Sequence, residues 1–378
     1  MKNNRTFLEK LLDGAEVEWK PLDEVANIVN NARKPVKSSL RVSGNIPYYG
    51  ANNIQDYVEG YTHDGEFVLI AEDGSASLEN YSIQWAVGKF WANNHVHVVN
   101  GKEGLNNRFL YHYLTSMNFI PFLAGKERAK LTKAKLQQIP IPIPPLPVQT
   151  KIVKILDALT SLTSELTSEL TLRRKQYEYY REKLLSHNDS ENSSQQKVDK
   201  DKLFSISNIQ WLHLNEIYKF QYGIGNKIPT IGGEYPVYGS NGIVGSHNEY
   251  NSEDAPVIGH IGAYAGIVNW AEGKHFVTYN GIICNKINDN VNSRYAYYLL
   301  LSQNFIDKAN KASQPFISYD ILNKCIVPVP PIEEQQRIVS ILDKFEALTN
   351  SITEGLPLAI EQSQNRYEYY RELLLNFS

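Results

Sequence analysis

The sequence predicts an α+β protein made of two copies of one unit, in which a β-rich globular domain is followed by a long helix. Three observations support this fold class: an internal repeat at an offset of about 190 residues, two stretches with heptad spacing of apolar residues, and a proline tract before each stretch. We expect the two long helices to pair as an antiparallel coiled coil and to give the chain a pseudo-two-fold internal repeat.

The repeat consists of five blocks with offsets between 186 and 192 residues. Tyr177–Glu182 and Tyr367–Glu372 are identical. Such constant offsets cannot arise by chance, so the chain is a tandem duplication. The other matching pairs are 17–25 with 209–217, 46–52 with 235–241, 141–149 with 327–335, and 152–157 with 338–343.

Length and composition indicate an ordinary soluble protein. A chain of 378 residues has room for two or three domains. The formal charge, 38 − 41 = −3, excludes a uniformly basic protein but leaves local basic patches open. No signal peptide, bilayer-spanning stretch or Cys-x-x-Cys spacing is visible. We therefore expect a cytoplasmic protein that holds no metal and no cofactor of its own.

The pattern of apolar residues, glycines and prolines predicts the following elements in chain order. Residues 1–14 are expected to form a helix stub that packs near the C-terminal helix, because Glu9–Leu12 copies the end of the first long helix. Residues 15–148 and 205–334 are expected to form the β-rich domains, since short apolar runs alternate there with Gly-containing turns. Expected strands include 67–70, 96–99 and 255–258, and expected helices include 108–116 and 294–301.

Residues 149–185 and 335–378 carry the long helices. From Ile152 to Leu184 the seam positions advance by 4, 3, 4 and 3, which is the heptad pattern of a coiled coil. Gly355 and Pro357 interrupt the second copy, so a kink or break is expected there. Residues 186–202 contain a single apolar residue, Val198, so residues 186–204 are expected to be a polar, flexible linker.

Basic residues cluster shortly before the first proline tract, and the second copy has a basic, polar counterpart. Lysine and arginine attract phosphates, while amide and hydroxyl side chains read base edges. The alternative is a solvated helix face. The candidate DNA-binding residues of the two segments are Lys126, Arg128, Lys130, Lys133 and Lys135 in the first copy and Lys308, Lys311, Gln314 and Ser318 in the second.

A repeated turn block gives three more candidate DNA contacts, Tyr49, Asn52 and Asn241. As an alternative, the block is a structural turn in which Gly50 and Gly239 adopt positive φ. Because both copies share the block, the structural interpretation is slightly favoured. Residues that read different sequences ought to differ between the copies.

The ends of the long helices combine tyrosine with arginine, a composition typical of protein interfaces. The alternative for these helix ends is a salt-bridged surface helix. The candidate partner-binding residues are Arg174, Tyr179, Arg181, Tyr369 and Arg371.

Two alternatives for the function of the whole chain also stay open. One is a metal-dependent nuclease with a site at Asp254, Glu272 and Lys274. The other is a coiled-coil scaffold without a DNA role.

The arrangement resembles the specificity subunit of bacterial type I restriction-modification systems. The resemblance rests on Ile141–Gln149 with Ile152-Val153, on Val327–Gln335 with Ile338-Val339, and on the helix ends 177–185 and 367–375. It covers essentially the whole chain.

The resemblance implies two target recognition domains that each read one half of a split DNA sequence. It also implies helices that set the gap between the half-sites and dock two methyltransferase subunits. The chain itself would be non-catalytic. Partners would supply adenine methylation with S-adenosylmethionine, and restriction subunits would use ATP and Mg²⁺ against foreign DNA.

Overall fold

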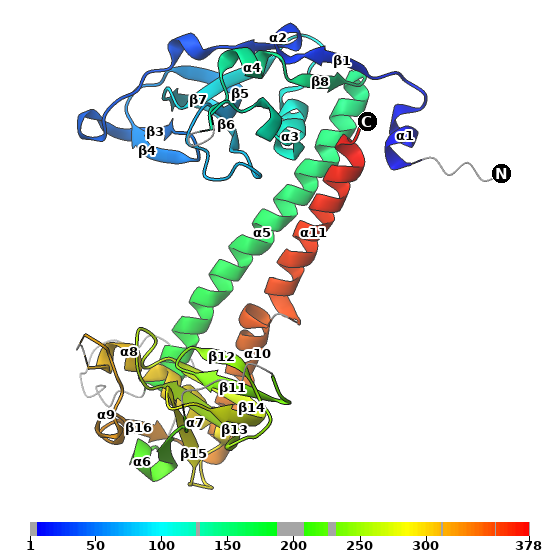
Figure 1. Cartoon of the computed structure of the whole chain (residues 1–378). Coiled ribbons are helices and arrows are strands. Elements are labelled where there is room, and N and C mark those ends of the chain that lie inside the picture. Colours follow the sequence, from blue (N-terminus) through cyan, green and yellow to red (C-terminus); the bar gives the residue numbers. More distant parts are fainter. Residues whose placement is uncertain are drawn as a thin grey trace, which may run out of the picture. The chain divides into compact units, whose positions relative to one another are not determined.

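The computed structural model describes residues 6–125, 129–186, 208–225, 232–310, 313–351 and 353–377. The chain divides into two compact units (Figure 1). Unit 1 contains residues 1–167 and 359–378, and unit 2 contains residues 168–358. Each unit therefore combines one globular domain with segments of the long helices.

The globular part of unit 1 has a two-stranded sheet, β1 (Glu18–Pro21) with β8 (Pro140–Ile143), and a six-stranded mixed sheet. All neighbours in the larger sheet are antiparallel except β3 and β6, which are parallel. In spatial order its strands are β2 (Ala26–Ile28), β7 (Val96–Gly101), β5 (His63–Ala71), β6 (Ile83–Ala92), β3 (Ser43–Tyr49) and β4 (Ile54–Val58). The shorter helices are α1 (Phe7–Leu12), α2 (Leu22–Val25), α3 (Asn107–Ser116), α4 (Lys133–Gln137) and the 3₁₀ turns η1 (Asn30–Ala32), η2 (Ser38–Leu40) and η3 (Ile120–Phe122).

Unit 2 repeats this plan with the same strand order, which confirms the duplicated α+β fold. Its small sheet pairs β9 (Gln210–His213) with β16 (Ile326–Val329). Its larger sheet runs β10 (Tyr218–Tyr222), β15 (Gly281–Lys286), β13 (Ser252–Gly259), β14 (Val268–Val277), β11 (Tyr235–Gly239) and β12 (Gly242–His247). The shorter helices are α6 (Leu214–Ile217), α7 (Ser293–Ser302), α8 (Phe305–Lys308) and α9 (Tyr319–Asn323).

The long helix α5 (Leu146–Leu185) contributes its first part to unit 1 and its last part to unit 2. Pro147 lies in its first turn, where the missing N–H costs no hydrogen bond. The predicted seam is confirmed, because its described side chains are all buried or half-buried while Leu162 and Leu172 outside it are exposed.

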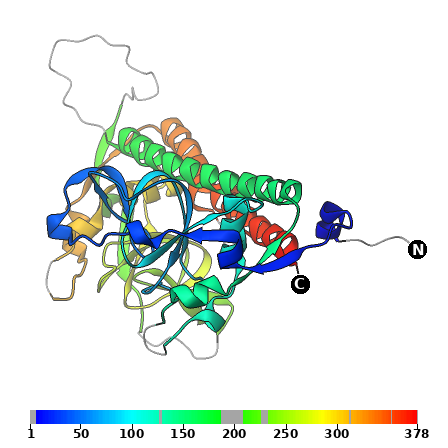
Figure 2. The same cartoon turned by 90° about the horizontal axis from the view of Figure 1, so that it is seen from above.

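The returning helix is broken as predicted: α10 ends at Asn350 and α11 starts at Gly355, which has φ 77°. Within unit 1, α5 and α11 (Gly355–Leu375) lie side by side and run antiparallel (Figures 1 and 2). The Thr163 and Ser363 hydroxyls are 2.9 Å apart, and Leu156, nearer the start of α5, shares a core with Leu374. Within unit 2, α10 (Ile332–Asn350) and the end of α5 meet in the same antiparallel sense.

The N-terminal stub packs against the C-terminal helix, as predicted. Leu8 belongs to the same apolar core as Leu374, and the Phe7 and Tyr370 rings meet edge to face at 6.4 Å. No helix formed by the described residues has both the length and the apolar character that a membrane span needs.

A buried glutamine ties each long helix to its domain. The Gln149 amide donates to the Pro144 and Gly104 carbonyls at 2.8 and 2.9 Å and accepts from the Asn106 N–H at 2.8 Å. Gln335 makes the matching set in unit 2, with distances of 2.8, 3.1 and 2.8 Å. In each unit, these three hydrogen bonds join the start of the long helix to the proline tract and to the loop before α3 or α7. Each such bond contributes about 1 kcal/mol net to stability.

A second duplicated link runs from an arginine to the long helix. The Arg108 Nε donates to Asp157 at 2.8 Å while its guanidinium lies 5.1 Å from the Trp85 ring centre. In unit 2, Arg294 repeats both contacts with Asp343 and Trp270. These cations are therefore held inside each unit by a carboxylate and by aromatic faces.

Candidate DNA interface and partner surfaces

In the first basic segment, Ala124 and Lys130 form an antiparallel β-bridge. Asn310 and Phe316 form the corresponding bridge in the second copy, so the described ends of the two segments are structurally equivalent. Lys126, Arg128 and Lys311 lie outside the described residues.

Lys130 is engaged within the protein. Its ammonium lies 2.9 Å from Glu72, whose other oxygen is 2.7 Å from the Arg33 guanidinium. Burial acts to raise the pKa of Glu72, but hydrogen bonds from Arg33 and Lys130 hold it below its usual range. Lys130 thus closes a structural network beside β5, and its equivalent in unit 2 is the uncharged Phe316.

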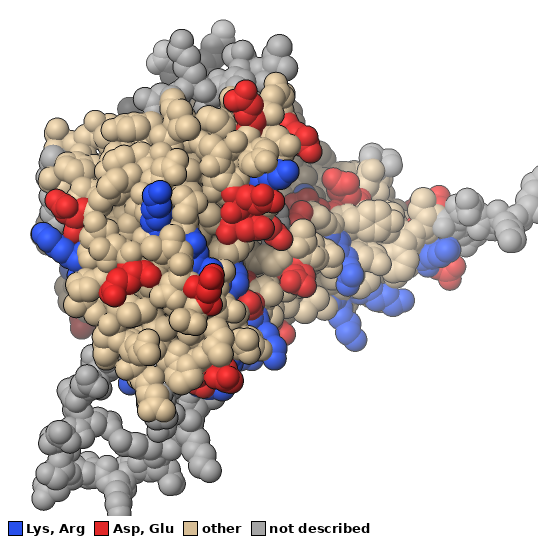
Figure 3. Space-filling model, turned by 90° about the horizontal axis from the view of Figure 1, so that it is seen from below, with Lys and Arg blue, Asp and Glu red and all other residues tan. Residues whose placement is uncertain are grey.

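Lys133 and Lys135 are exposed on α4, whose N-terminus is capped by Thr132. In unit 2, the Lys308 ammonium is exposed but donates to the Gln303 side chain at 3.0 Å. Gln314 is exposed, and the half-buried Ser318 precedes α9. Figure 3 shows Lys and Arg interspersed with Asp and Glu on the face that it presents, with uncharged surface between them.

In unit 1 the turn block makes contacts within the protein. Asn52 donates to the Gly74 carbonyl at 2.7 Å and accepts from the Ala76 N–H at 2.7 Å, and Tyr49 packs edge to face on Phe90. Burial raises the pKa of Tyr49. Asn241 is exposed beside Gly242 at the turn between β11 and β12.

The prediction that Gly50 and Gly239 adopt positive φ is wrong; Gly242 does so instead, with φ 81°. A Cβ placed at Gly50 would lie 2.1 Å from the end of the Gln55 side chain. Gln55 is exposed and its long side chain can move aside, so neither an unusual backbone angle nor close packing requires glycine at this position.

Two of the three residues of the nuclease alternative have structural contacts. Asp254 accepts from the Gly273 N–H at 2.7 Å, and the Lys274 ammonium lies 4.7 Å from the Tyr250 ring centre. Within the described parts of the chain, no group of three or more His, Cys, Asp or Glu side chains is placed to hold a metal ion.

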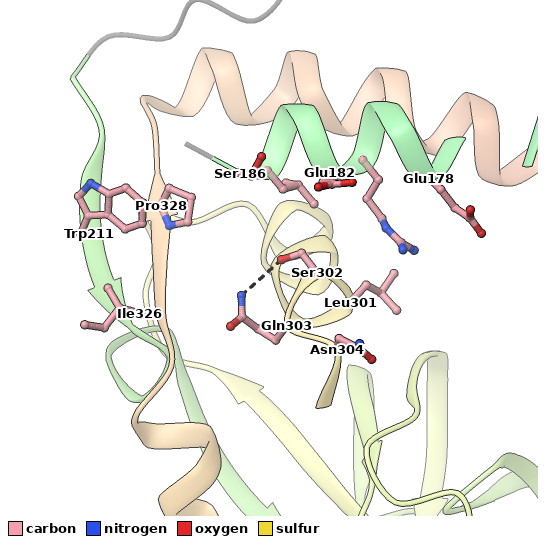
Figure 4. A pocket seen from close by; sticks show the side chains of 12 residues that line it. Glu178, Glu182, Ser186, Trp211, Leu301, Ser302, Gln303, Asn304, Ile326 and Pro328 are labelled. Carbon is pink, nitrogen blue, oxygen red and sulfur yellow. Dashed lines mark hydrogen bonds between the residues drawn. The ribbon is translucent and has the colours of Figure 1, made fainter. Parts of the chain in front are cut away.

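The tyrosine-rich helix ends border a pocket that occurs in both units. In unit 2 it has a volume of about 620 Å³ and is lined by Arg181 and Glu182 of α5, by Trp211 and by the end of α7 (Figure 4). In unit 1 the equivalent residues Arg371, Glu372 and Trp19 line a pocket of about 500 Å³.

Sequence reasoning missed these pockets, although the tryptophans stand in aligned blocks 192 residues apart. Trp19 and Trp211 are 47% and 45% exposed, which is unusual for such large apolar side chains. Arg181 and Arg371 each lie over a tyrosine ring, and Tyr179 and Tyr369 are exposed. Arg174 is exposed and donates to the Thr349 carbonyl at 3.4 Å.

Comparisons with known proteins agree with the duplicated plan. The family model for the type I restriction-modification DNA specificity domain matches residues 15–175 and 214–362. A Haemophilus influenzae protein, named provisionally as a type I restriction enzyme specificity subunit, is 62% identical over the whole of both chains. The EcoR124I/EcoR124II specificity subunit of Escherichia coli is 32% identical over 98% of this chain and 97% of its own.

Among solved structures, the S subunit of a type I system from M. genitalium shares the fold, with a TM-score of 0.63, 17% identity, and coverage of 99% of this chain and 96% of that one. Since the family model matches both halves, and since the sequence relationships extend over nearly the whole length, this chain belongs to the DNA specificity subunits of type I restriction-modification systems.

Proposed function

We propose that this chain is the non-catalytic subunit that gives a type I restriction-modification complex its DNA sequence specificity. Each globular domain reads one half of a bipartite target, and the long helices set the gap between the halves. The observation that carries the proposal is the duplication itself. Two domains with one strand order, both attached to a single helix, can present two reading surfaces to one duplex.

The chemistry is assigned to partners: methyltransferase subunits that use S-adenosylmethionine, and restriction subunits that use ATP and Mg²⁺. The carboxylates considered for a nuclease are consistent with this division: Asp254 accepts a hydrogen bond from the Gly273 N–H, and the described residues contain no group of three or more His, Cys, Asp or Glu side chains placed to hold a metal ion. Lys133 and Lys135 are proposed phosphate contacts, since both are exposed on one short helix. We expect the assembly in the bacterial cytoplasm, where its DNA substrate lies.

Mapping methylated adenines tests this function. The chain assembled with methyltransferase subunits is expected to direct methylation to one split sequence with an unspecified gap of constant length. The chain alone should neither methylate nor cleave DNA, with or without Mg²⁺. Metal-dependent cleavage by the purified chain would contradict the proposal, and so would methylation without a bipartite sequence.

The twin pockets are proposed docking sites for the two methyltransferase subunits. Two identical partners need two equivalent surfaces, and each unit offers tryptophan, arginine, glutamate and leucine in the same arrangement. Tryptophan and arginine dominate binding energy at protein interfaces, where a central residue contributes about 2 kcal/mol or more.

Replacing these tryptophans should change the stoichiometry of the complex. Trp19→Ala or Trp211→Ala is expected to weaken one methyltransferase site about thirtyfold, leaving one bound subunit in place of two at submicromolar concentration. The double variant should bind neither. Native mass spectrometry measures the stoichiometry, and Tyr57→Ala removes an equally exposed aromatic outside the pockets as a control. Two bound subunits in both single variants would contradict the assignment.

A further inference from the structure

A pocket of about 750 Å³ lies in unit 1 beside the hairpin of β3 and β4. One wall is the segment Lys34–Val42, which connects β2 to β3. The other walls are the buried Tyr48 on β3, the end of β4, and Trp91 on β6. None of the candidate DNA contacts discussed above lies in it.

The pocket is positively charged. Its lining carries three cations, Lys34, Lys37 and Arg41, against the single carboxylate of Glu59. Lys34 and Lys37 are both exposed. Arg41 is fixed, because its guanidinium lies 4.1 Å from the Tyr48 ring centre and 3.3 Å from Asp56. The two lysines are thus available for an anionic ligand.

Apolar side chains stand directly beside these cations. The side chains of Leu40 and Val42 are 70% and 60% exposed. Neighbouring apolar side chains that are this exposed are typical of a binding surface. Cations next to exposed aliphatic groups match the major groove of DNA, where phosphates border base edges and thymine methyl groups.

The segment is held in one conformation by the sheet. The Trp91 indole N–H donates to the Lys34 carbonyl at 2.7 Å, and the Lys34 N–H donates to the Ala92 carbonyl at 3.0 Å. The Val36 N–H donates to the Tyr48 hydroxyl at 3.0 Å. A rigid surface loses little conformational entropy when it binds, so the pocket is already organised for a ligand.

The same connection differs sharply between the two copies. Residues 29–42, between β2 and β3, contain four basic and no acidic residues. Residues 223–234, between the corresponding strands β10 and β11, contain one basic and one acidic residue. The surrounding strands have the same order in both units. A segment that changes on a common scaffold is where two domains that read different sequences are expected to differ.

From the charge, the exposed aliphatic groups, the rigidity and the difference between copies, we propose that this pocket is a DNA-contacting surface of the first recognition domain, in addition to the phosphate contacts of Lys133 and Lys135 proposed above. Lys34 and Lys37 bind backbone phosphates, and Leu40 and Val42 contact base edges of one half-site only. The inference rests on the proposed function and adds a surface through which unit 1 reads its half-site.

The test uses the full chain assembled with methyltransferase subunits and a duplex carrying the mapped target. Lys34→Ala with Lys37→Ala should weaken binding about tenfold and make the salt dependence of log K shallower by up to about 2. Lys151→Ala with Lys154→Ala removes the same charge from exposed positions on α5 and serves as the control. Thermal unfolding verifies that each variant is folded.

A second variant separates base reading from general attraction. Leu40→Ala with Val42→Ala should relax the methylated sequence in one half of the target and leave the other half unchanged. Lysine variants that bind like the control, or relaxation of both halves, would overturn the inference. Loss of methyltransferase assembly without loss of DNA affinity would also overturn it and assign the pocket to a protein partner. If the unmodified complex showed no sequence preference at all, the proposed function itself would fail.

Discussion

A chain that ends at Leu185 is expected to dimerise and to recognise a palindrome built from its own half-site. In the full chain, the first part of α5 packs in unit 1 against α11, and Ile152, Leu156 and Leu374 share one core. Removing α11 exposes this apolar seam to water. Burying it again is the driving force for association.

A second copy of the fragment can replace the missing helix closely. Its segment Tyr177–Leu185 differs from Tyr367–Leu375 at a single position, Lys183 in place of Leu373. The residues that α11 contributes to the core of unit 1, among them Tyr367, Tyr370 and Leu374, are therefore all present in the partner's α5. An isologous dimer results, with two identical recognition domains.

Light scattering gives the mass of the fragment, and methylation mapping of the reconstituted complex gives its target. Leu184→Asp in the fragment is the matched control, because it places a charge at the position that substitutes for Leu374. This variant should remain monomeric at concentrations where the fragment dimerises. A stable monomer of the unchanged fragment would count against pairing of the two helices.

Adding one Leu-Thr-Ser-Glu copy to the repeat at 162–171 is expected to widen the gap between half-sites by roughly 1–2 base pairs. Four helical residues add about 6 Å, and one base pair spans about 3.4 Å of duplex. Four residues turn a helix by about 40° beyond one full turn, so Thr163, Leu166 and Leu170 keep approximately their half-buried face. The half-sites should not change, because neither globular domain is altered.

The break between α10 and α11 gives the returning chain a non-helical stretch next to Gly355 that can extend with the longer helix. A two-residue insertion is the control, since it turns the seam by about 200° and should lower the melting temperature. Methylation mapping measures the gap. The original gap in the lengthened chain would mean that the added turn is absorbed locally, and the helices would not act as a ruler.

Several features of this protein could be predicted from sequence because they depend on local periodicity. The seam from Ile152 to Leu184 follows the helical repeat, and Gly355 with Pro357 marks the break regardless of what packs nearby. The predicted strands 67–70, 96–99 and 255–258 all lie within observed strands. Because the repeat aligns the two halves, one correctly predicted element implied its counterpart.

Other features depend on residues that the fold brings together from distant positions. Lys130 is a candidate DNA contact by sequence, and the fold also places its ammonium 2.9 Å from Glu72, which lies 58 residues earlier in the chain. Gly50 and Gly239 were expected to adopt positive φ, but in the second copy it is Gly242 that does so. Neither feature leaves a periodic signal in the sequence.

The sequence by itself determined that this protein has two homologous units, where its long helices lie and where the second is interrupted. Repeats and helical periodicity record these features within short stretches of chain. The tertiary structure alone decided which polar side chains form contacts within the protein and which surfaces are exposed to solvent. The twin tryptophan pockets and the basic pocket beside β3 are each assembled from non-adjacent segments, and their shape and charge exist only once the sheet has set those segments side by side.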